Sequence, residues 1–508
     1  MNFNSMFKSM SKVVNHEGAP AYAQTPELEL YTAVVTTSLS NTFYEEQGDR
    51  MNRIVELVGK VSPEFVAQLA VYTRTEMHLR SVPLLLLVEL AKVHKGDDLV
   101  ARAVEKTVLR ADEIMELLIC YQMRNPTGKS NKKIGPLSHQ LQNGLERAFN
   151  HFDEYQFAKY DRDNLEVKLR DALFLVHPKA KDIHQQEIFD KITNRQLATP
   201  YTWETELSAL GQQQFASATE REQAFGEKWS ELIMSGKVGY MALMRNLRNM
   251  LQAQVPYHIM EQVSARLSDP VQVAKSKQLP FRYLSAFREL LGVTSTSTQL
   301  VLTALENAVK HSANNIEGFD PQTRVLLACD VSGSMYSRIS ANSTVSCYDI
   351  GLLLAMLLRN RCHQVITGIF GDTWLPVNLP SDNILMATQN LRSISGKVGY
   401  STNGYEVIKW LIENQKVMDK VMLFTDLQMW DSRYGGTVSI EQTWKAYKKI
   451  APDAKLYLFD LVGYGNTPLR MVRPDVYLIA GWSDRIFDVL SAIEHGGDTL
   501  DAIRNIKL

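Results

Sequence analysis

Apolar residues follow a helical pattern through the first part of the chain. From about residue 25 to residue 311 they recur at spacings of three and four, within segments of roughly 10 to 16 residues, which predicts one helix after another. Short polar stretches separate these segments, and helices joined by short loops pack antiparallel. No long strand-like alternation interrupts the pattern. We therefore predict a solenoid of paired helices over this region.

Three of the predicted helices begin with a capping residue followed by proline. Such a start gives the first helical N–H groups a side-chain acceptor, and proline at the first position loses no hydrogen bond. One face of the second helix carries Phe65, Leu69 and Tyr72 at spacings of four and three, so this face should pack against a neighbouring helix. The three starts are Thr25-Pro26, Ser62-Pro63 and Asp269-Pro270.

The periodicity changes after a connector rich in turn-forming residues at positions 314–321. Short apolar segments rich in β-branched and aromatic residues then alternate with helical ones, which predicts an α/β domain with a mainly parallel sheet buried on both faces. We accordingly assign residues 1–318 to a helical module and residues 319–508 to the α/β domain. The predicted strands are 325–329, 364–370, 420–425, 456–461 and 476–480, and a helix is predicted over 348–359.

Composition excludes several classes of protein. The chain has 508 residues, of which 45% are hydrophobic and 22% charged, so it is long enough for two cores and too apolar to be disordered. Lysine and arginine number 55 against 56 acidic residues, so any nucleic-acid site must be a local basic patch. The apolar runs are too short to cross a bilayer, and no membrane association is expected.

The four cysteines stand apart from one another, without a Cys-x-x-Cys pair. This spacing predicts reduced thiols in a cytoplasmic protein, with neither a disulfide nor a zinc site. The N-terminal residues 1–15 also lack the continuous apolar stretch that a signal peptide needs.

A candidate metal site follows the first predicted strand of the α/β domain. Asp330, Ser332 and Ser334 offer a carboxylate and two hydroxyls at alternate positions, and Gly333 permits a tight turn between them. Thr402 and Asp426 lie at the ends of other segments of this domain. In parallel sheets, ligands bind at the carboxyl ends of the strands, so we expect the metal site to face solvent there. Oxygen ligands of this kind suit Mg²⁺ or Mn²⁺, and we expect modest affinity.

Two alternatives to a metal-binding role remain for these residues. The serines could cap the turn that follows, with Asp330 ending the strand. An aspartyl phosphatase would also place an aspartate at a strand end, but it would need a proton donor at position 332, where this chain has serine. No nucleophile and base occur at a recognisable spacing, so we expect a binding protein and not an enzyme.

Positive charge is concentrated locally in the helical region. Between residues 124 and 150 the stretch includes Lys129, Lys132 and Lys133, in a segment that favours a phosphate-binding loop. Further along, Lys159 and Arg162 precede a helix predicted over 165–176. Pro178 ends that helix and leaves His177 and Lys179 at its rim. A solvated basic surface without a ligand would explain the same residues.

Three segments of the chain, 169–179, 239–247 and 302–335, together resemble the Ro ribonucleoprotein family. That family combines a TROVE module with a von Willebrand factor A domain. The series Asp330, Ser332, Ser334, Thr402 and Asp426 is similar to the metal-ion-dependent adhesion site of that domain type. The order and spacing of the segments fit over nearly the whole chain, although the loop at 124–139 fits loosely.

The resemblance implies a ring of HEAT-like helical repeats closed by the A domain. It implies a Y-like noncoding RNA on the outer rim and single-stranded 3′ ends of misfolded or unprocessed RNA in a central hole, with roles in RNA quality control or maturation. An exoribonuclease is an implied partner, the protein is expected to be monomeric, and Mg²⁺ or Mn²⁺ is the implied metal. The residues carried over or expected as RNA contacts are Lys159, Arg162, Arg170, His177, Lys179, Lys129, Lys132 and Lys133.

A protein-binding adaptor is the competing interpretation. In that case the metal would hold an acidic partner and the helical region would bind a second protein, without RNA. The basic residues beside His177 and the TROVE-like segments favour RNA over this alternative.

Overall fold

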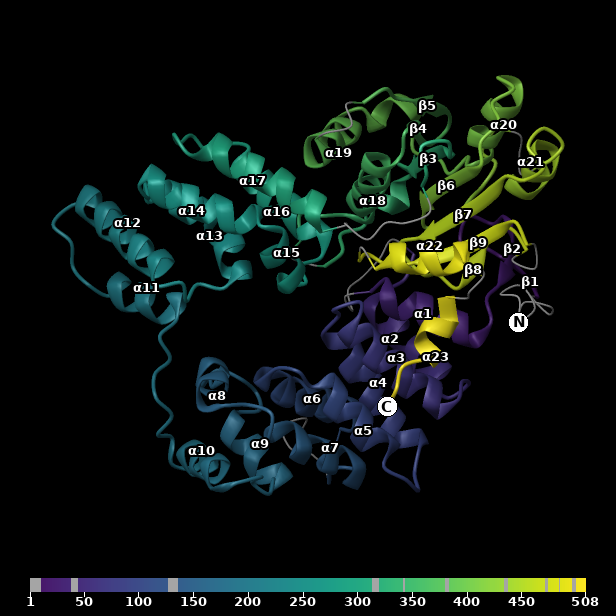
Figure 1. Ribbon diagram of the computed structural model, residues 1–508. Helices are drawn as coiled ribbons and strands as arrows, with labels where there is room; N and C mark the ends of the chain where they lie inside the picture. The colour runs from purple at the N-terminus through teal and green to yellow at the C-terminus, as the bar shows by residue number, and fades with distance from the viewer. Residues whose placement is uncertain are drawn as a thin grey trace. The chain divides into compact units, whose positions relative to one another are not determined.

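The structure is a computed structural model that describes residues 11–37, 44–126, 136–312, 319–340, 343–379, 383–433, 437–470, 474–483, 485–495 and 499–508. The chain divides into two compact units (Figure 1). The helical unit contains residues 51–208 and 500–508, and the sheet unit contains residues 1–50 and 209–499. This packing follows a different division from the predicted one at residues 318 and 319.

The helical unit is built from antiparallel helices that pack in sequence. Ser62 caps α3 by accepting a hydrogen bond from the Phe65 N–H (3.2 Å), and Phe65, Leu69 and Tyr72 are buried, as predicted. Each fully buried side chain of this size contributes about 1.5–3 kcal/mol. The helices are α2 (Gln47–Val58), α3 (Pro63–Thr75), α4 (Ser81–Val93), α5 (Leu99–Thr107), α6 (Ala111–Arg124), α7 (His139–Phe149), α8 (Glu154–Tyr160), α9 (Leu169–Val176), α10 (Ile183–Asn194) and α11 (Trp203–Gly211).

The C-terminal segment belongs to the helical unit and not to the α/β domain that the sequence suggested. Helix α23 (Thr499–Arg504) and the residues after it lie against α3 and α5. Gln68 of α3 donates to the carbonyls of Arg504 (2.7 Å) and Ile506 (3.3 Å), and Lys106 of α5 donates to the carbonyl of Lys507 (2.8 Å). These hydrogen bonds join residues about four hundred positions apart, so no local pattern could have indicated them.

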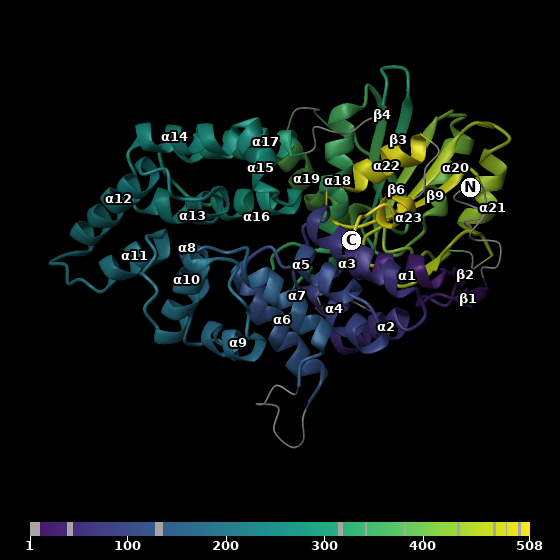
Figure 2. The same cartoon turned by 60° about the horizontal axis from the view of Figure 1, so that its bottom comes forward.

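The sheet unit also contains helices, which form two layers. In Figure 2, α14 and α17 lie above α13 and α16. Asp269 caps α15 through the Gln272 N–H (2.8 Å), which confirms the predicted start there. The helices are α12 (Ala218–Met234), α13 (Tyr240–Gln252), α14 (Tyr257–Ser268), α15 (Pro270–Ser276), α16 (Pro280–Leu290) and α17 (Thr298–His311).

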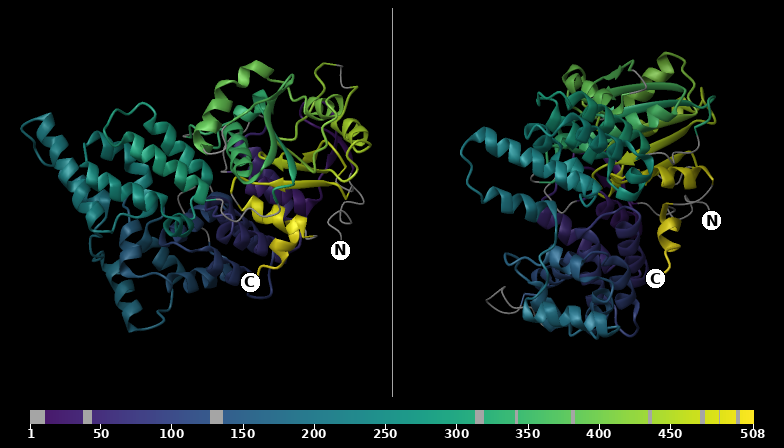
Figure 3. Two further views of the ribbon diagram at one scale, coloured as in Figure 1. Left: turned by 45° about the horizontal axis from the view of Figure 1, so that its top comes forward. Right: turned by 60° about the vertical axis from the view of Figure 1, so that its left-hand side comes forward.

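The α/β part is a six-stranded sheet in the order β5-β4-β3-β6-β7-β9, mainly parallel as predicted. Every residue of β6 is buried, so both faces of the sheet are covered. Strand β5 pairs antiparallel at the edge, which the sequence did not predict. The green and yellow strands are visible in both views of Figure 3. The strands are β3 (Arg324–Asp330), β4 (Gln364–Phe370), β5 (Trp374–Pro376), β6 (Lys420–Thr425), β7 (Lys455–Asp460) and β9 (Val476–Ala480).

Helices cover the sheet on both sides. Helix α18 packs against β3 and β6, and Figure 2 shows it across these strands from α20 and α21. The Asp349 carboxylate near the start of α18 accepts a hydrogen bond from Arg288 of α16 (2.6 Å), which ties the helical layers to the sheet. The helices are α18 (Cys347–Arg361), α19 (Ile384–Ser393), α20 (Tyr405–Glu413), α21 (Ile440–Tyr447) and α22 (Ile486–Glu494), with short 3₁₀ segments at Gly333–Tyr336 and Ser395–Val398.

The N-terminal residues correct the prediction that only helices precede residue 315. Strands β1 (Lys12–Val14) and β2 (Pro20–Ala23) form a hairpin, and β2 pairs with β8 (Asn466–Thr467). Helix α1 (Pro26–Val35) follows, capped by Thr25, and the Tyr31 hydroxyl donates to the carbonyl of Ala480 (3.2 Å). The helix-only prediction is therefore wrong for residues 12–23, because their pairing partner lies far away in the sequence.

Two smaller predictions concern the cysteines and membrane association. Cys120, Cys329, Cys347 and Cys362 are all free, as expected. Among the described residues, no helix has both the length and the apolar character needed to cross a membrane.

Candidate functional site

The first candidate site lies where the order of strands reverses, between β3 and β6. These neighbouring parallel strands pair Cys329 with Phe424, so Asp330 and Asp426 leave the same edge of the sheet. The Ser332 N–H donates to one oxygen of Asp330 (2.8 Å), and the Thr425 hydroxyl donates to the other (2.7 Å). The Ser332 and Ser334 hydroxyl oxygens are 3.3 Å apart. The first strand end thus presents its three oxygen groups as one cluster.

Backbone hydrogen bonds bring the other two segments to the same edge. The Gly333 N–H donates to the carbonyl of Tyr400 (3.1 Å), two residues before Thr402. The Trp430 N–H donates to the carbonyl of Thr402 (3.3 Å), four residues after Asp426. Ser334 lies close enough to the Asp426 carboxylate to oppose the rise in the pKa of Asp426 that burial causes. The structure therefore gathers the three segments that carry the five predicted metal ligands.

These ligands are less accessible than the sequence suggested. We expected a site facing solvent, but the side chains of Asp330, Ser332, Ser334, Thr402 and Asp426 belong to residues that are at most 4% exposed. The N-terminal hairpin contributes to the enclosure: the Asn15 side chain donates to the carbonyl of Met429 (3.0 Å), and the His16 N–H donates to the Gln428 side chain (2.9 Å). These neighbours come from more than four hundred positions away, so the sequence carried no sign of them.

The electrostatics of this cluster favour a cation. Burial raises the pKa of Asp330, and the negative charge of Asp426 raises it further. Burial likewise raises the pKa of Asp426, and the charge of Glu17 adds to the effect. One oxygen of Asp426 is buried without a hydrogen-bond partner. Because an unpartnered buried carboxylate oxygen is costly, a small hard cation beside it would offset both desolvation and repulsion.

The donor set fits Mg²⁺ or Mn²⁺. It offers two carboxylates and three hydroxyls, which are oxygen ligands of the kind that these cations accept together with water. Within the described residues, no three histidine, cysteine, aspartate or glutamate side chains gather as a metal site. This donor set therefore differs from the sites that metallohydrolases use.

The second candidate site is a group of cations around α8 and α9. Lys159 ends α8 instead of preceding a helix, and the next helix begins at Leu169 and not at residue 165. Lys159 and Arg162 are both exposed. None of the ion pairs found among the described residues includes Lys159, Arg162, Arg170, His177 or Lys179, although several other cations of the helical unit are paired.

Helix α7 holds the segment around His177 through its backbone. The Gln142 side chain donates to the carbonyl of Val176 (3.0 Å), Glu146 accepts from the Lys179 N–H (3.3 Å), and Asn150 donates to the carbonyl of Lys179 (2.9 Å). His177 adopts the left-handed conformation at φ 51° that ends α9. Since the backbone makes these bonds, the side chains of His177 and Lys179 stay exposed for a ligand.

The predicted basic residues come from different parts of the chain around α9: Lys159 from α8, Arg162 from the loop before α9, Arg170 from α9 itself, and His177 and Lys179 from its end. Helix α9 has eight residues and is therefore about 12 Å long, and it separates Arg162 from His177 along the chain. Arg170 lies in the first turn, with its guanidinium 5.3 Å from the centre of the Phe174 ring. Lys129, Lys132 and Lys133 lie outside the described residues. The sequence singled out the cations, whereas Phe174 went unnoticed although its spacing from Arg170 was visible.

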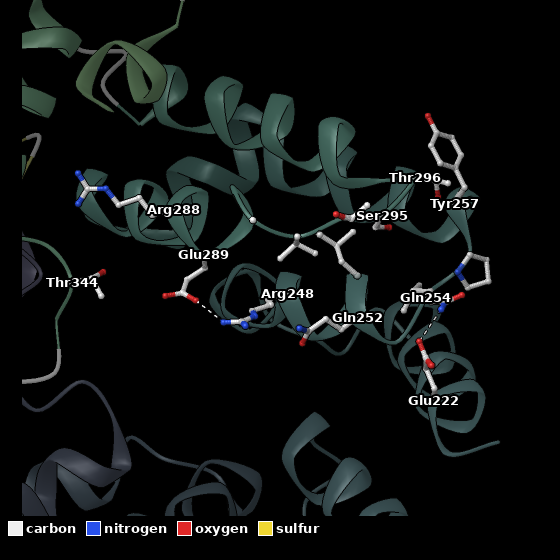
Figure 4. Close-up of a pocket in the computed structure, with 16 residues that line it drawn as sticks. Glu222, Arg248, Gln252, Gln254, Tyr257, Arg288, Glu289, Ser295, Thr296 and Thr344 are labelled. Atoms are coloured by element: carbon white, nitrogen blue, oxygen red, sulfur yellow. Dashed lines mark hydrogen bonds and ion pairs between the residues drawn. The ribbon is translucent and has the colours of Figure 1, made fainter. Parts of the chain in front are cut away.

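A groove in the sheet unit proves a poor phosphate site. It has a volume of about 1050 Å³ and is lined by residues of α12, α13, α14, α16 and the loop before α17 (Figure 4). Arg248 pairs with Glu289 (3.2 Å) on its wall, and Gln254 donates to Glu222 (2.9 Å). Arg288 is bound to Asp349. Because its arginines already have carboxylate partners, the groove has little free positive charge.

The fold and the first site define a class of protein, namely helical repeats joined to a von Willebrand A-type domain. The chain matches the TROVE domain over residues 31–228 and 193–324 and the Ro60 vWA domain over residues 324–493. Since these matches cover more than half of the sequence, the chain belongs to the Ro family.

Individual relatives are more distant. The chain is 22% identical to telomerase protein component 1 of Rattus norvegicus over 348 residues, which is 53% of this chain and 13% of that protein. It is 25% identical over 271 residues to the RNA-binding protein RO60 of Deinococcus radiodurans, which is 51% of this chain and 50% of that protein. The chain thus spans half or less of the length of these relatives.

A solved structure supports the fold. The crystal structure of the Deinococcus radiodurans RO (RSR) protein aligns with a TM-score of 0.58 at 19% identity, covering 91% of this chain and 99% of that one. This likeness confirms the predicted combination of helical repeats with an α/β domain.

Proposed function

We propose that this chain is an RNA-binding protein whose helical unit holds RNA through the cations around α9. The observation that carries the proposal is the set of basic side chains at Lys159, Arg162, Arg170, His177 and Lys179, for which the described part of the chain provides no ion-pair partner. Cations that stabilise a fold normally have carboxylate partners, whereas free ones can bind phosphates. The name of the Deinococcus relative, an RNA-binding protein, supports the same conclusion.

We further propose a Y-like folded RNA as the ligand of this surface. Basic residues on α8, in the loop after it, on α9 and at the end of α9 suit phosphates arranged by the shape of a folded RNA, without base-specific hydrogen bonds. Single-stranded 3′ ends of misfolded RNA would be a second ligand class, and an exoribonuclease a partner. Quality control or maturation of noncoding RNA in the cytoplasm, by a monomer that does not itself cut RNA, is the role we propose.

The metal cluster supports a second, separate proposal. We infer that Asp330, Ser332, Ser334, Thr402 and Asp426 hold Mg²⁺ or Mn²⁺, because Asp426 has a buried oxygen without a partner. When bound, the cation would supply a coordination position for an acidic group of a protein partner. Within the chain, Thr425 and the Ser332 N–H orient Asp330, while the Gln428 N–H orients Asp426 (3.0 Å). The adaptor alternative would rest on this site alone.

The test of RNA binding compares free cations with paired ones. A variant with Lys159→Ala, Arg162→Ala and His177→Ala removes free cations, whereas Arg102→Ala, Arg147→Ala and Lys191→Ala removes cations of the same unit that have carboxylate partners. We expect only the first variant to lose affinity for a folded RNA. Equal losses in both would show that net charge, and not this site, drives binding.

A further inference from the structure

Phe174 breaks the burial pattern of α9. Leu169, Ala172, Leu173 and Val176 are buried and form the inner face of the helix. Phe174 lies outside this face and is 46% exposed. An aromatic ring on the polar side of a short amphipathic helix contributes little stability through burial, so burial does not explain its position.

Basic residues lie before and after Phe174 along the chain. Arg170 is one helical turn before it, on the same face of α9, and His177 follows it by three residues at the left-handed end of the helix. The Arg170 guanidinium is 5.3 Å from the ring centre, and its Nε is buried without a hydrogen-bond partner. Because no carboxylate of the described residues pairs with it, the guanidinium keeps its charge available beside the ring.

This combination matches the chemistry of an unpaired nucleotide. An unstacked base offers a flat π-surface that stacks on an aromatic ring, and its phosphates attract neighbouring cations. An arginine lying near the same ring can contact either the base or the phosphate. An acidic protein segment would use the cations but would leave the exposed ring without a flat partner.

We propose that Phe174 is a stacking platform for an unpaired base of the bound RNA, with Arg170 and His177 holding the adjacent phosphates. This inference rests on the proposed RNA-binding function and assigns a single-stranded nucleotide to one position on the surface. It distinguishes two kinds of contact on one helix. The Phe174 ring contributes affinity independently of salt, whereas Arg170 contributes the part that salt weakens.

Four variants test the proposal. Phe174→Leu keeps an apolar side chain but removes the flat ring, and Phe174→Trp enlarges the ring. Arg170→Ala removes the cation. Ile183→Ala is the matched control, because Ile183 is an even more exposed apolar residue, at 81%, in the next helix. Thermal unfolding of each variant verifies that the fold is intact.

The probes are a short oligoadenylate and an RNA duplex, each titrated at several salt concentrations. Phe174→Leu should weaken oligoadenylate binding about 5-fold to 100-fold, with the slope of log affinity against log salt unchanged. Phe174→Trp should bind at least as well as the parent, and oligoadenylate should quench the fluorescence of the added tryptophan. Arg170→Ala should reduce the salt slope by about 0.7. Duplex binding should change little in Phe174→Leu.

Separate outcomes overturn the proposal and the function on which it rests. A parent protein that binds neither RNA would refute RNA binding itself. If the parent binds but Phe174→Leu binds equally well, or if Ile183→Ala loses as much, then Phe174 is no stacking platform. An equal loss for the duplex would indicate that the ring contacts backbone or protein and not an unpaired base.

Discussion

The sheet edge and the α9 surface use polar side chains in opposite ways. At the sheet edge and on the helix α18 that packs on the sheet, polar groups are buried and nearly all hydrogen-bonded, as with Asp330 at the edge and the Asp349 carboxylate of α18, which binds Arg288. Around α9, Lys159 and Arg162 are exposed and no ion pair among the described residues includes them, whereas Lys168 at the start of the helix pairs with Asp163 (3.6 Å). A buried partnered group contributes mainly to the fold, whereas an exposed unpartnered one contributes mainly to binding. We therefore expect replacing an arginine to lower stability in the first region and RNA affinity in the second.

The largest expected effect on stability comes from Arg288. Replacing it in Arg288→Ala leaves the buried Asp349 with only part of its partners, namely Arg392 and the N–H (2.8 Å) and hydroxyl (2.9 Å) of Ser346. Breaking a buried ion pair costs about 3 to 5 kcal/mol of unfolding free energy, and the remaining partners favour the lower figure. Chemical denaturation measures this loss of unfolding free energy.

Arg248→Ala is the control for this prediction. Its partner Glu289 also lies on α16, but both side chains are about half exposed. Surface pairs contribute about 0 to 1 kcal/mol, so this variant should unfold almost like the parent. Similar losses in both arginine variants would remove the distinction between buried and exposed pairs.

The largest expected effect on binding comes from the combined variant Lys159→Ala, Arg162→Ala, His177→Ala. Hydrogen bonds to charged groups contribute about 1.5 to 3 kcal/mol each, so losing two or three should weaken binding of a folded RNA about 100-fold or more. The slope of log affinity against log salt should flatten by about 0.7 to 0.9 for each lost phosphate contact.

Thermal unfolding should barely change in this combined variant, because all three residues are exposed and the structure as described gives none of them an ion pair. The exception to watch is His177, whose left-handed backbone at φ 51° ends α9. Alanine is strained in that conformation, so His177→Asn, which tolerates it better, separates a backbone effect from a lost contact. A well-folded combined variant with unchanged affinity and salt slope would revive the adaptor interpretation.

Local sequence patterns predicted local features well. Capping at Thr25, Ser62 and Asp269 depends only on the next three residues, and all three caps are present. Strands 364–370 and 476–480 were predicted with the bounds that the structure has, because buried strands carry a continuous apolar signal. The convergence of Asp330 and Asp426 followed from the rule that parallel strands end at one edge.

Features that depend on distant partners were missed. Strands β1 and β2 have little apolar pattern of their own and exist because β8 pairs with β2 more than four hundred residues away. The same hairpin hydrogen-bonds to Gln428, two residues beyond Asp426, and the cluster is buried where we expected it to face solvent. Phe174 was missed for another reason, because an exposed aromatic residue looks like a core residue until the burial of its neighbours is known.

A smaller effect is expected for metal binding. Asp330→Ala removes the carboxylate that Ser332 and Thr425 orient. We expect the parent to bind Mg²⁺ with modest affinity and this variant to lose that binding, as measured by calorimetry. Asp419→Ala is a suitable control, since Asp419 lies on the same sheet but pairs with Arg324 (2.6 Å) near the opposite ends of the strands. Undiminished Mg²⁺ binding by Asp330→Ala would count decisively against the site.

The smallest effect is expected on RNA affinity when the sheet-edge cluster is altered and the α9 surface is left intact. The variant Ser332→Ala, Ser334→Ala alters hydroxyls beside two buried carboxylates, a cluster whose own charge repels phosphate. The free cations around α9 attract phosphate directly, so this variant should bind a folded RNA within about twofold of the parent, and with the same salt slope. Filter binding in Mg²⁺ and in a chelator measures both conditions. A loss above about tenfold in a folded variant would mean that RNA affinity depends on the metal cluster, and the contrast between a fold-supporting sheet edge and an RNA-binding helix would fail.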